Sequence, residues 1–272
     1  MNRSARWLGV SALAVLLALS TGCSKLKARD QLNKGVQSYK AAKFEDAIEH
    51  FKNAVALDPN LGVARLYLAT AYVGLYVPGI DTPENNRNAE MALEQYQEVL
   101  KKKPNDTLSL KGIASLYFNM KKFEEAKQYH HKVLQVDPSD PETYYTIGVI
   151  DWSEAYQPRM EARNKLGLKP DEPLKDKKEC DDLRTKNQDI VQDGIEKLRK
   201  AIELRQDYGD AMAYLNLMYR EKADIECGDE VARAEDLKQA DDYVEKAKAA
   251  MKAKAEKEAN KAAGVVAEPG QQ

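Results

Sequence analysis

Residues 123–140 of the chain read FEEAKQYHHKVLQVDPSD, and this stretch decides the fold. Its proline closes an ordered series with a small residue twelve positions earlier, a bulky ring eight positions earlier and another small residue five positions earlier. The series is Ala126, His130, Val133 and Pro138. The small residues let two helix backbones approach, the bulky ring fills the gap between them, and the proline stops the helix.

The same series occurs at two earlier places in the chain, and Pro104 and Pro138 are 34 positions apart. Self-similarity at a fixed period of this length indicates an architecture of stacked helical repeats. A first helix precedes each series and carries its own small residue near an aromatic, as Gly148 stands near Trp152. The two earlier sets are Ala47-Phe51-Ala54 before Pro59 and Ala92-Tyr96-Val99 before Pro104.

This pattern resembles the tetratricopeptide (TPR) repeat, and the resemblance covers residues 28 to about 254. It implies an all-α TPR α-solenoid of about five helix-turn-helix units. The composition agrees, because alanine, leucine, glutamate and lysine dominate and favour helices. We expect no sheet.

Three units are longer than the repeat, and we expect inserted or extended hairpins in units two, four and five. Unit two has about 11 extra residues at 76–86, and unit five has about 12 around residues 227–229. Unit four holds one extra repeat length, which predicts long helices at roughly 142–166 and 177–204. A whole degenerate repeat is the alternative. Phrases in units two and four are similar to those of a group of bacterial TPR proteins with no established activity.

The N-terminus has the features of an export signal. Arg3 and Arg6 precede an apolar run over residues 7–19, which is shorter than the roughly 20 residues that span a bilayer. Ser20-Thr21-Gly22-Cys23 follows at once and resembles the cleavage site of a bacterial lipoprotein precursor. The resemblance implies acylation of Cys23 and stable anchoring by three acyl chains. Ser20 stands where leucine is usual, and ordinary secretion with a coincidental cysteine is the alternative.

These signals predict four segments. They are a lipoprotein signal peptide over residues 1–22, a lipidated tether over 23–27, a TPR solenoid over 28–262 and a disordered tail over 263–272. Ser24 follows the cysteine in place of aspartate, and by the same resemblance this favours the periplasmic face of the outer membrane.

The titratable residues form no recognisable catalytic or metal-binding set. His130 takes the place held by Phe51 and Tyr96 in sister repeats, which predicts a packed core residue. The neighbouring His131 points about 100° away on a helix, so the two cannot share a metal. No zinc-binding His-Glu motif, phosphate loop or nucleophile elbow occurs. We expect no enzyme, no cofactor, no metal and no small-molecule substrate.

Charge is nearly balanced, with 42 basic and 44 acidic residues, and this steers the chain toward no nucleic acid. Two further cysteines, Cys180 and Cys227, follow Cys23. Export would place them where a disulfide persists. Counted from the turn between their two helices, they are offset by about 9–10 Å. An unwound helix end would close that offset, and two free, partly buried thiols are the alternative.

Stacked TPR units line a concave groove with their first helices, and the family resemblance assigns helix positions 2, 5, 9, 12 and 13 to it. Aromatic side chains that line up along these positions suit an extended peptide or an apolar helix. In the alternative, these side chains only pack against neighbouring repeats or the C-terminal helix. The candidate partner-binding residues are Tyr39, Phe118, Asn119, Tyr145, Trp152 and Arg220.

The sequence therefore predicts a membrane-tethered scaffold or adaptor that binds protein partners in the cell envelope. Barrel assembly, piloting of secretin or pilus machinery, and regulation of cell-wall hydrolases remain equally open roles. A rival hypothesis is a hydrolase or metal-binding protein with a site in the 150–190 insertion, where Glu154, Asp171, Glu179 and Asp182 supply carboxylates. A third hypothesis is a purely structural spacer.

Overall fold

The computed structural model of the chain describes residues 23–169 and 172–262. These residues are helical between short turns, with no strand among them. They divide into two compact units, unit 1 up to Val136 and unit 2 from Asp137. Unit 1 contains the first three of the expected repeats, and unit 2 contains the fourth and fifth. The predicted signal peptide and tail lie outside the described residues.

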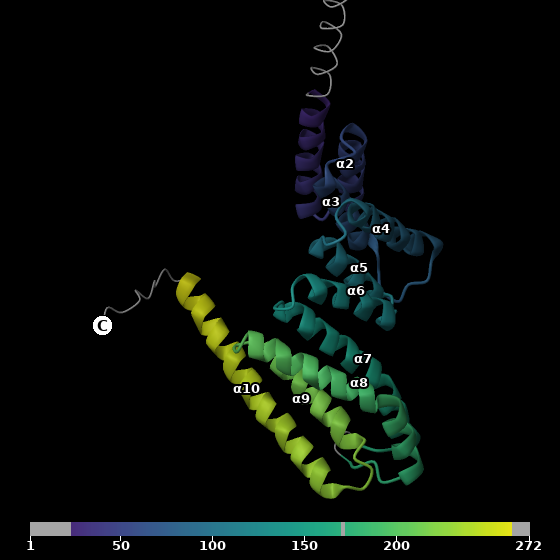
Figure 1. Cartoon of the computed structure of the whole chain (residues 1–272), viewed down its shortest axis with the longest axis vertical. Coiled ribbons are helices and arrows are strands. Elements are labelled where there is room, and N and C mark those ends of the chain that lie inside the picture. Colours follow the sequence, from purple (N-terminus) through teal and green to yellow (C-terminus); the bar gives the residue numbers. More distant parts are fainter. Residues whose placement is uncertain (1–22, 170–171, 263–272) are drawn as a thin grey trace, which may run out of the picture. The chain divides into compact units, whose positions relative to one another are not determined.

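Unit 1 consists of three helix hairpins. Residues 23–40 and α2 (Phe44–Leu57) form the first, α3 (Gly62–Leu75) and α4 (Pro83–Lys102) the second, and α5 (Thr107–Asn119) and α6 (Phe123–Val136) the third. Consecutive helices pack against one another from α2 through α6 (Figure 1). Each of α2, α4 and α6 is the proline-terminated helix that the repeat predicts.

The core of unit 1 is built on the small-and-bulky series read from the sequence. All nine of its residues before Pro59, Pro104 and Pro138 are buried, including His130. The contact is close at Gly35, where an added Cβ would lie 2.4 Å from a ring carbon of Phe51. Small residues therefore stand where two helices meet, as predicted.

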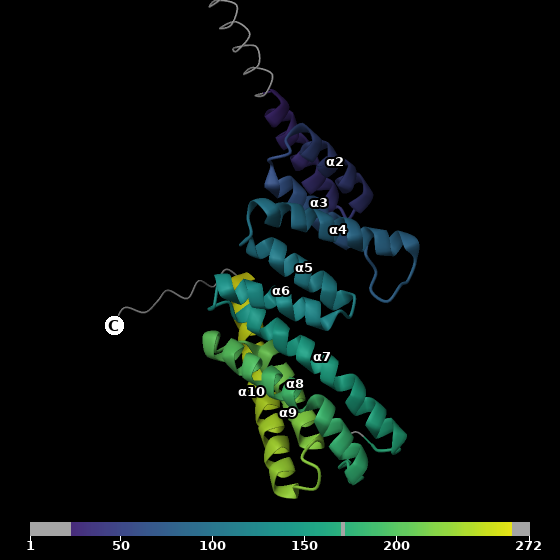
Figure 2. The ribbon, with the colours of Figure 1, turned by 45° about the vertical axis from the view of Figure 1, so that its right-hand side comes forward.

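Unit 2 consists of two hairpins with much longer helices. They are α7 (Pro141–Lys165) with α8 (Lys177–Leu204), and α9 (Gly209–Asp224) with α10 (Glu230–Ala262). Figures 1 and 2 show α7 and α8 running side by side, with α9 packed on both and α10 packed on α9. The bounds of α7 and α8 confirm lengthened helices in unit four, in place of a degenerate extra repeat.

Local sequence signals fix where these helices begin. The Asp140 carboxylate accepts a hydrogen bond from the Glu142 amide at 3.3 Å, and Pro141 occupies the first turn of α7. The Asp176 carboxylate accepts one from the Glu179 amide at 3.0 Å at the start of α8. Both caps satisfy an amide that would otherwise lack a partner.

The structure shows where the inserted residues and the expected tether lie. Of the extra residues 76–86 of the second repeat, residues 76–82 form a loop and residues 83–86 belong to α4, which starts at Pro83 after the capping residue Thr82. The extra residues of the fifth repeat lengthen α10, which starts at Glu230. Residues 23–27, expected as a tether, continue the first helix without a break.

Candidate functional site

Helices α7 and α9, together with the residue that caps the start of α9, bring five aromatic side chains together. Tyr214 of α9 lies between two residues of α7, with its ring centroid 5.7 Å from that of Tyr145 and 5.4 Å from that of Trp152. Both contacts are edge-on, at interplanar angles of 76° and 77°. Such angles are typical of favourable aromatic pairs. We call this set the aromatic cluster: Tyr145, Trp152, Tyr156, Tyr208 and Tyr214.

The cluster extends in both directions along α7. Tyr156 follows one turn after Trp152, at 5.0 Å between ring centroids, and is 38% exposed. Tyr208 lies 5.0 Å from Tyr145 at the other end. Tyr145, Trp152 and Tyr214 are half-buried. The rings thus pack on a neighbouring repeat, as one interpretation expected, and still present part of their surface to solvent.

Charged groups order the Tyr208 end of the cluster. The Glu142 carboxylate accepts hydrogen bonds from the Tyr208 hydroxyl and, at 2.6 Å, from Arg205 Nη1. Burial works to raise the pKa of Glu142, but these two donors outweigh it and lower that pKa. Burial also raises the pKa of Tyr145 to about 12, so its hydroxyl stays protonated at any physiological pH.

Arg220, the remaining groove candidate of unit 2, is engaged elsewhere. Its Nη2 lies 2.8 Å from Asp241 Oδ1 of α10, and its Nε donates to Asn216 Oδ1 at 3.1 Å. The structure therefore ties Arg220 to the last hairpin and does not bring it into the aromatic cluster.

The candidates of unit 1 lie at the ends of first helices. Tyr39 packs edge-on against Phe44 at 5.4 Å, and Phe118 lies 6.0 Å from Phe123. In each pair the partner ring opens the second helix of the same hairpin. Asn119 is half-buried at the end of α5. These contacts favour a packing role for Tyr39 and Phe118.

A buried ionic network joins the far part of α7 to the end of α9. Arg163 Nη1 and Arg159 Nε donate to one oxygen of Asp224, at 2.6 Å and 2.7 Å. Arg159 Nη1 also lies 3.4 Å from Glu221 Oε1. Arg163, Glu221 and Asp224 are each at most 4% exposed. Because breaking a buried ion pair is costly, the network holds the long hairpin against α9.

Glu221 is the weakest member of this network. Its second carboxylate oxygen is buried without a hydrogen-bond partner among the described residues. Burial raises its pKa to about 7, against the opposing effect of Arg159. Glu221 therefore exchanges a proton near neutral pH.

A disulfide closes the same end of unit 2. Cys180, in the first turn of α8, is bonded to Cys227, with their Cα atoms 5.4 Å apart. Helix α9 ends at Asp224, three residues before Cys227. The non-helical residues 225–227 close the offset between the two helices.

The carboxylates of the rival hydrolase hypothesis do not gather into a site. Glu179 is ion-paired to Lys165, Asp182 is exposed, and Asp171 lies outside the described residues. Among the residues that the structure describes, no three histidine, cysteine or acidic side chains are placed to hold a metal. In the same residues, no helix is both long and apolar enough to cross a membrane.

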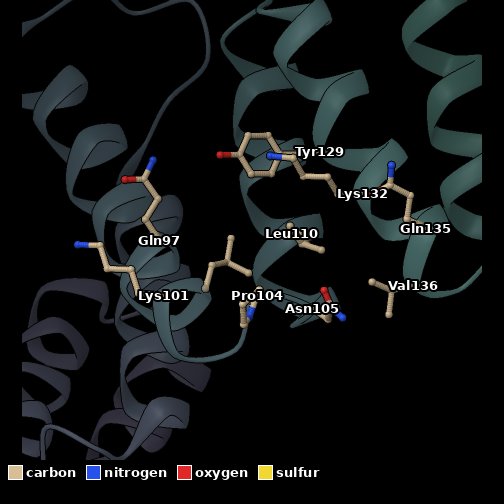
Figure 3. A pocket seen from close by; sticks show the side chains of 10 residues that line it. Gln97, Lys101, Pro104, Asn105, Leu110, Tyr129, Lys132, Gln135 and Val136 are labelled. Carbon is tan, nitrogen blue, oxygen red and sulfur yellow. The ribbon is translucent and has the colours of Figure 1, made fainter.

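Unit 1 carries an open pocket of about 780 Å³ on its second helices (Figure 3). Gln97 and Lys101 of α4 line one wall, and Tyr129 and Lys132 of α6 line the other. The Lys132 ammonium lies 4.2 Å from the centre of the Tyr129 ring. This pocket could not be predicted from the sequence, because none of its residues takes a groove position.

Cys23, the predicted acylation site, is exposed at the start of the described chain and forms no disulfide. The residues of the predicted signal peptide before it lie outside the described residues. The helix over the described residues 23–40 leads directly from Cys23 into the first hairpin.

Comparison with known proteins supports the fold. No protein-family model and no curated protein sequence matches the chain. Among solved structures, a crystal structure of MamA is 16% identical, covers 85% of this chain and 94% of that chain, and has a TM-score of 0.54. MamA from Desulfovibrio magneticus RS-1 is 16% identical over 84% of this chain and 96% of that chain, with a TM-score of 0.55. A likeness at this identity shows the fold alone. Together with the buried repeat series, it confirms an all-α fold of the TPR type.

Proposed function

We propose that this chain is a non-enzymatic scaffold of the cell envelope, anchored by a lipid on Cys23, that holds a protein partner on the aromatic cluster of unit 2. The observation that carries the proposal is the contact of Trp152 and Tyr145 with Tyr214 on two adjacent first helices. In a TPR fold, first helices are the usual partner-binding face.

The physical properties of the cluster suit protein recognition. Tyrosine and tryptophan are enriched among the residues that dominate binding energy, because they bury large areas at a small entropy cost. Here the rings hold one another in place, so their side chains lose little further conformational freedom on binding. The exposed part of Tyr156 extends the surface by one turn of α7.

The partner that this surface fits is an extended peptide or an apolar helix. Both present side chains at intervals that match successive turns of a helix. Trp152 and Tyr156 are one turn apart on α7, and Tyr214 provides a second row on α9. Tyr39 and Phe118 have a structural role in this proposal, because each packs within its own hairpin.

The disulfide and the N-terminal sequence both support a location outside the cytoplasm. Disulfides persist in oxidising compartments and are rare in the cytosol. The Cys180–Cys227 bond therefore agrees with the export that residues 1–23 predict. The periplasmic face of the outer membrane is the location that we propose.

Affinity purification after crosslinking in cells tests the binding surface. We expect the paired change Trp152→Ala and Tyr214→Ala to reduce recovery of the partner at least about tenfold, as removal of interface aromatics does. Tyr243→Ala is the matched control, since Tyr243 is a half-buried ring stacked on Tyr219 outside the cluster. Equal recovery from all three proteins would favour the structural spacer.

The anchor is tested separately by labelling cells with a fatty acid. We expect Cys23→Ala to abolish labelling and to leave the protein uncleaved or soluble. Unchanged membrane fractionation of this variant would refute the anchor without bearing on the aromatic cluster.

A further inference from the structure

The first two turns of the helix over residues 23–40 carry a basic surface with one exposed apolar side chain. Lys25, Lys27 and Arg29 are exposed, and none has an ion-pair partner among the described residues. Leu26 lies among them and is 72% exposed. Elsewhere the charges nearly cancel, and the whole chain has a net charge of −2. Unpaired cations around an exposed leucine are the pattern of a surface that contacts a membrane.

These turns are held rigidly against the first hairpin. Ala28 is fully buried, roughly 160° around the helix from Leu26, and Gln31 Oε1 lies 2.8 Å from His50 Nδ1 of α2. Asp30, the acidic residue of these turns, is ion-paired to Lys34 at 2.8 Å. The helix that carries the basic side chains therefore keeps one orientation relative to the first hairpin.

The distance to the proposed anchor is short. A helix rises about 1.5 Å per residue, so Arg29 lies only about 9 Å along the axis from Cys23. Electrostatic attraction in physiological salt acts over about 8 Å. If acyl chains on Cys23 enter the bilayer, Lys25, Lys27 and Arg29 lie within reach of the lipid headgroups.

We propose that Lys25, Leu26, Lys27 and Arg29 form a second membrane contact, in which the cations bind anionic phospholipid headgroups and Leu26 enters the apolar layer. This surface deepens the proposed lipid tethering and rests on it. A rigid contact beside the anchor fixes how unit 1 stands on the bilayer, which a flexible tether would not do.

Tryptophan placed at position 26 tests this contact directly. The acylated chain, carrying Trp152→Phe to remove the other tryptophan of the described residues, is reconstituted in vesicles of phosphatidylethanolamine and phosphatidylglycerol whose acyl chains are brominated. We expect L26W fluorescence to be quenched. The matched control V231W replaces a side chain that is 82% exposed at the start of α10, and we expect its fluorescence to be unquenched.

Removing the positive charges, or the negative charges of the lipid, tests whether the headgroups contribute to the contact. Neutralising Lys25, Lys27 and Arg29 to glutamine, or using phosphatidylcholine alone, should bring quenching at position 26 down to that at position 231. The same triple change at Lys252, Lys254 and Lys257, on the exposed end of α10, should have no effect. Equal quenching at positions 26 and 231 in acylated protein would overturn the contact and leave the anchor standing.

Mass spectrometry of the purified protein shows whether Cys23 carries acyl chains. If Cys23 carries no acyl chain, the L26W protein is added to preformed vesicles instead. There, each neutralised cation should weaken binding to phosphatidylglycerol vesicles about fivefold. Unchanged emission on addition of these vesicles would overturn the contact independently.

Discussion

At the scale of single residues, the helix contacts depend on where a side chain is missing. An added Cβ at Gly148 of α7 would lie 2.5 Å from Leu198 Cγ of α8, in the middle of a fully buried side chain. An added Cβ at Gly62, at the start of α3, would meet nothing within 4 Å. The same substitution should therefore have opposite effects at these two positions.

We expect Gly148→Ala to lower the free energy of unfolding by about 1–3 kcal/mol, the usual cost of overpacking. Gly62→Ala should leave it unchanged or raise it by up to about 1 kcal/mol, because alanine favours a helix. Urea unfolding followed by circular dichroism measures both. A Gly148→Ala protein as stable as the wild type would show that α7 and α8 do not pack as closely as described.

Glu221 makes the stability of unit 2 depend on pH. Its pKa in the fold is about 7, above the ordinary value of 4.5. A carboxyl group with a raised pKa contributes its full stability below the unfolded pKa and loses it as the pH rises through the folded value. We therefore expect the free energy of unfolding to fall between pH 5 and pH 8, by up to about 3 kcal/mol.

Glu221→Gln should remove most of that fall, since the amide cannot ionise. Glu245→Gln is the control, because Glu245 is an exposed residue of α10 with 73% of its side chain accessible. Its unfolding should keep the pH dependence of the wild type. If Glu221→Gln also kept it, another group would be responsible.

Residue-scale prediction from the sequence succeeded where a repeat supplied a comparison. His130 was assigned to the core because Phe51 and Tyr96 hold its place in sister repeats, and it is buried. The sequence does not indicate Tyr156 and Tyr214, because neither takes a groove position of the TPR pattern. In the sequence, Tyr156 is marked only by its place one helical turn after Trp152, and Tyr214 only by its place next to Ala213. The pairing of Arg163 with Asp224 joins residues 61 apart, and no periodicity indicates it.

At the scale of elements, helix length in unit four was predictable and helix starts were less so. The expected 142–166 and 177–204 differ from α7 and α8 by at most one residue. In the second repeat, counting repeat lengths placed an insertion at residues 76–86 but did not indicate where the second helix begins. Thr82 followed by Pro83 is, however, a helix-start signal, and the Thr82 side chain accepts a hydrogen bond from the Asn85 amide at 3.3 Å.

The disulfide acts at this scale, because it ties the start of α8 to the turn between α9 and α10. Its loop spans 47 residues, which corresponds to about 4 kcal/mol of stabilisation in the chain-entropy description. We expect reduction to lower the free energy of unfolding of unit 2 by about 2–4 kcal/mol. Trp152, the tryptophan of the described residues, reports this transition by its fluorescence.

Cys180→Ser with Cys227→Ser should reproduce the effect of the reductant and remove any further response to it. A transition that stayed at the same urea concentration with and without reductant would contradict the assignment. Cys23 forms no disulfide, so its presence does not affect the comparison.

At the scale of the whole molecule, the sequence predicted the fold class but not the distribution of roles between the two units. One repeat pattern runs through both, yet the longest helices (α7, α8 and α10), the ionic network and the disulfide all belong to unit 2. The basic surface beside Cys23 belongs to unit 1. We propose that unit 1 contacts the membrane and that unit 2 binds the partner protein.

The most direct test of this account is a photoreactive amino acid at position 156, the exposed edge of the aromatic cluster. In cells, we expect a discrete crosslinked protein from position 156 that is absent when the same group stands at position 231. The adduct should disappear when Trp152→Ala is added and persist when Tyr243→Ala is added. No adduct at position 156, or the same adduct from both positions, would contradict a partner-binding surface on α7 and α9.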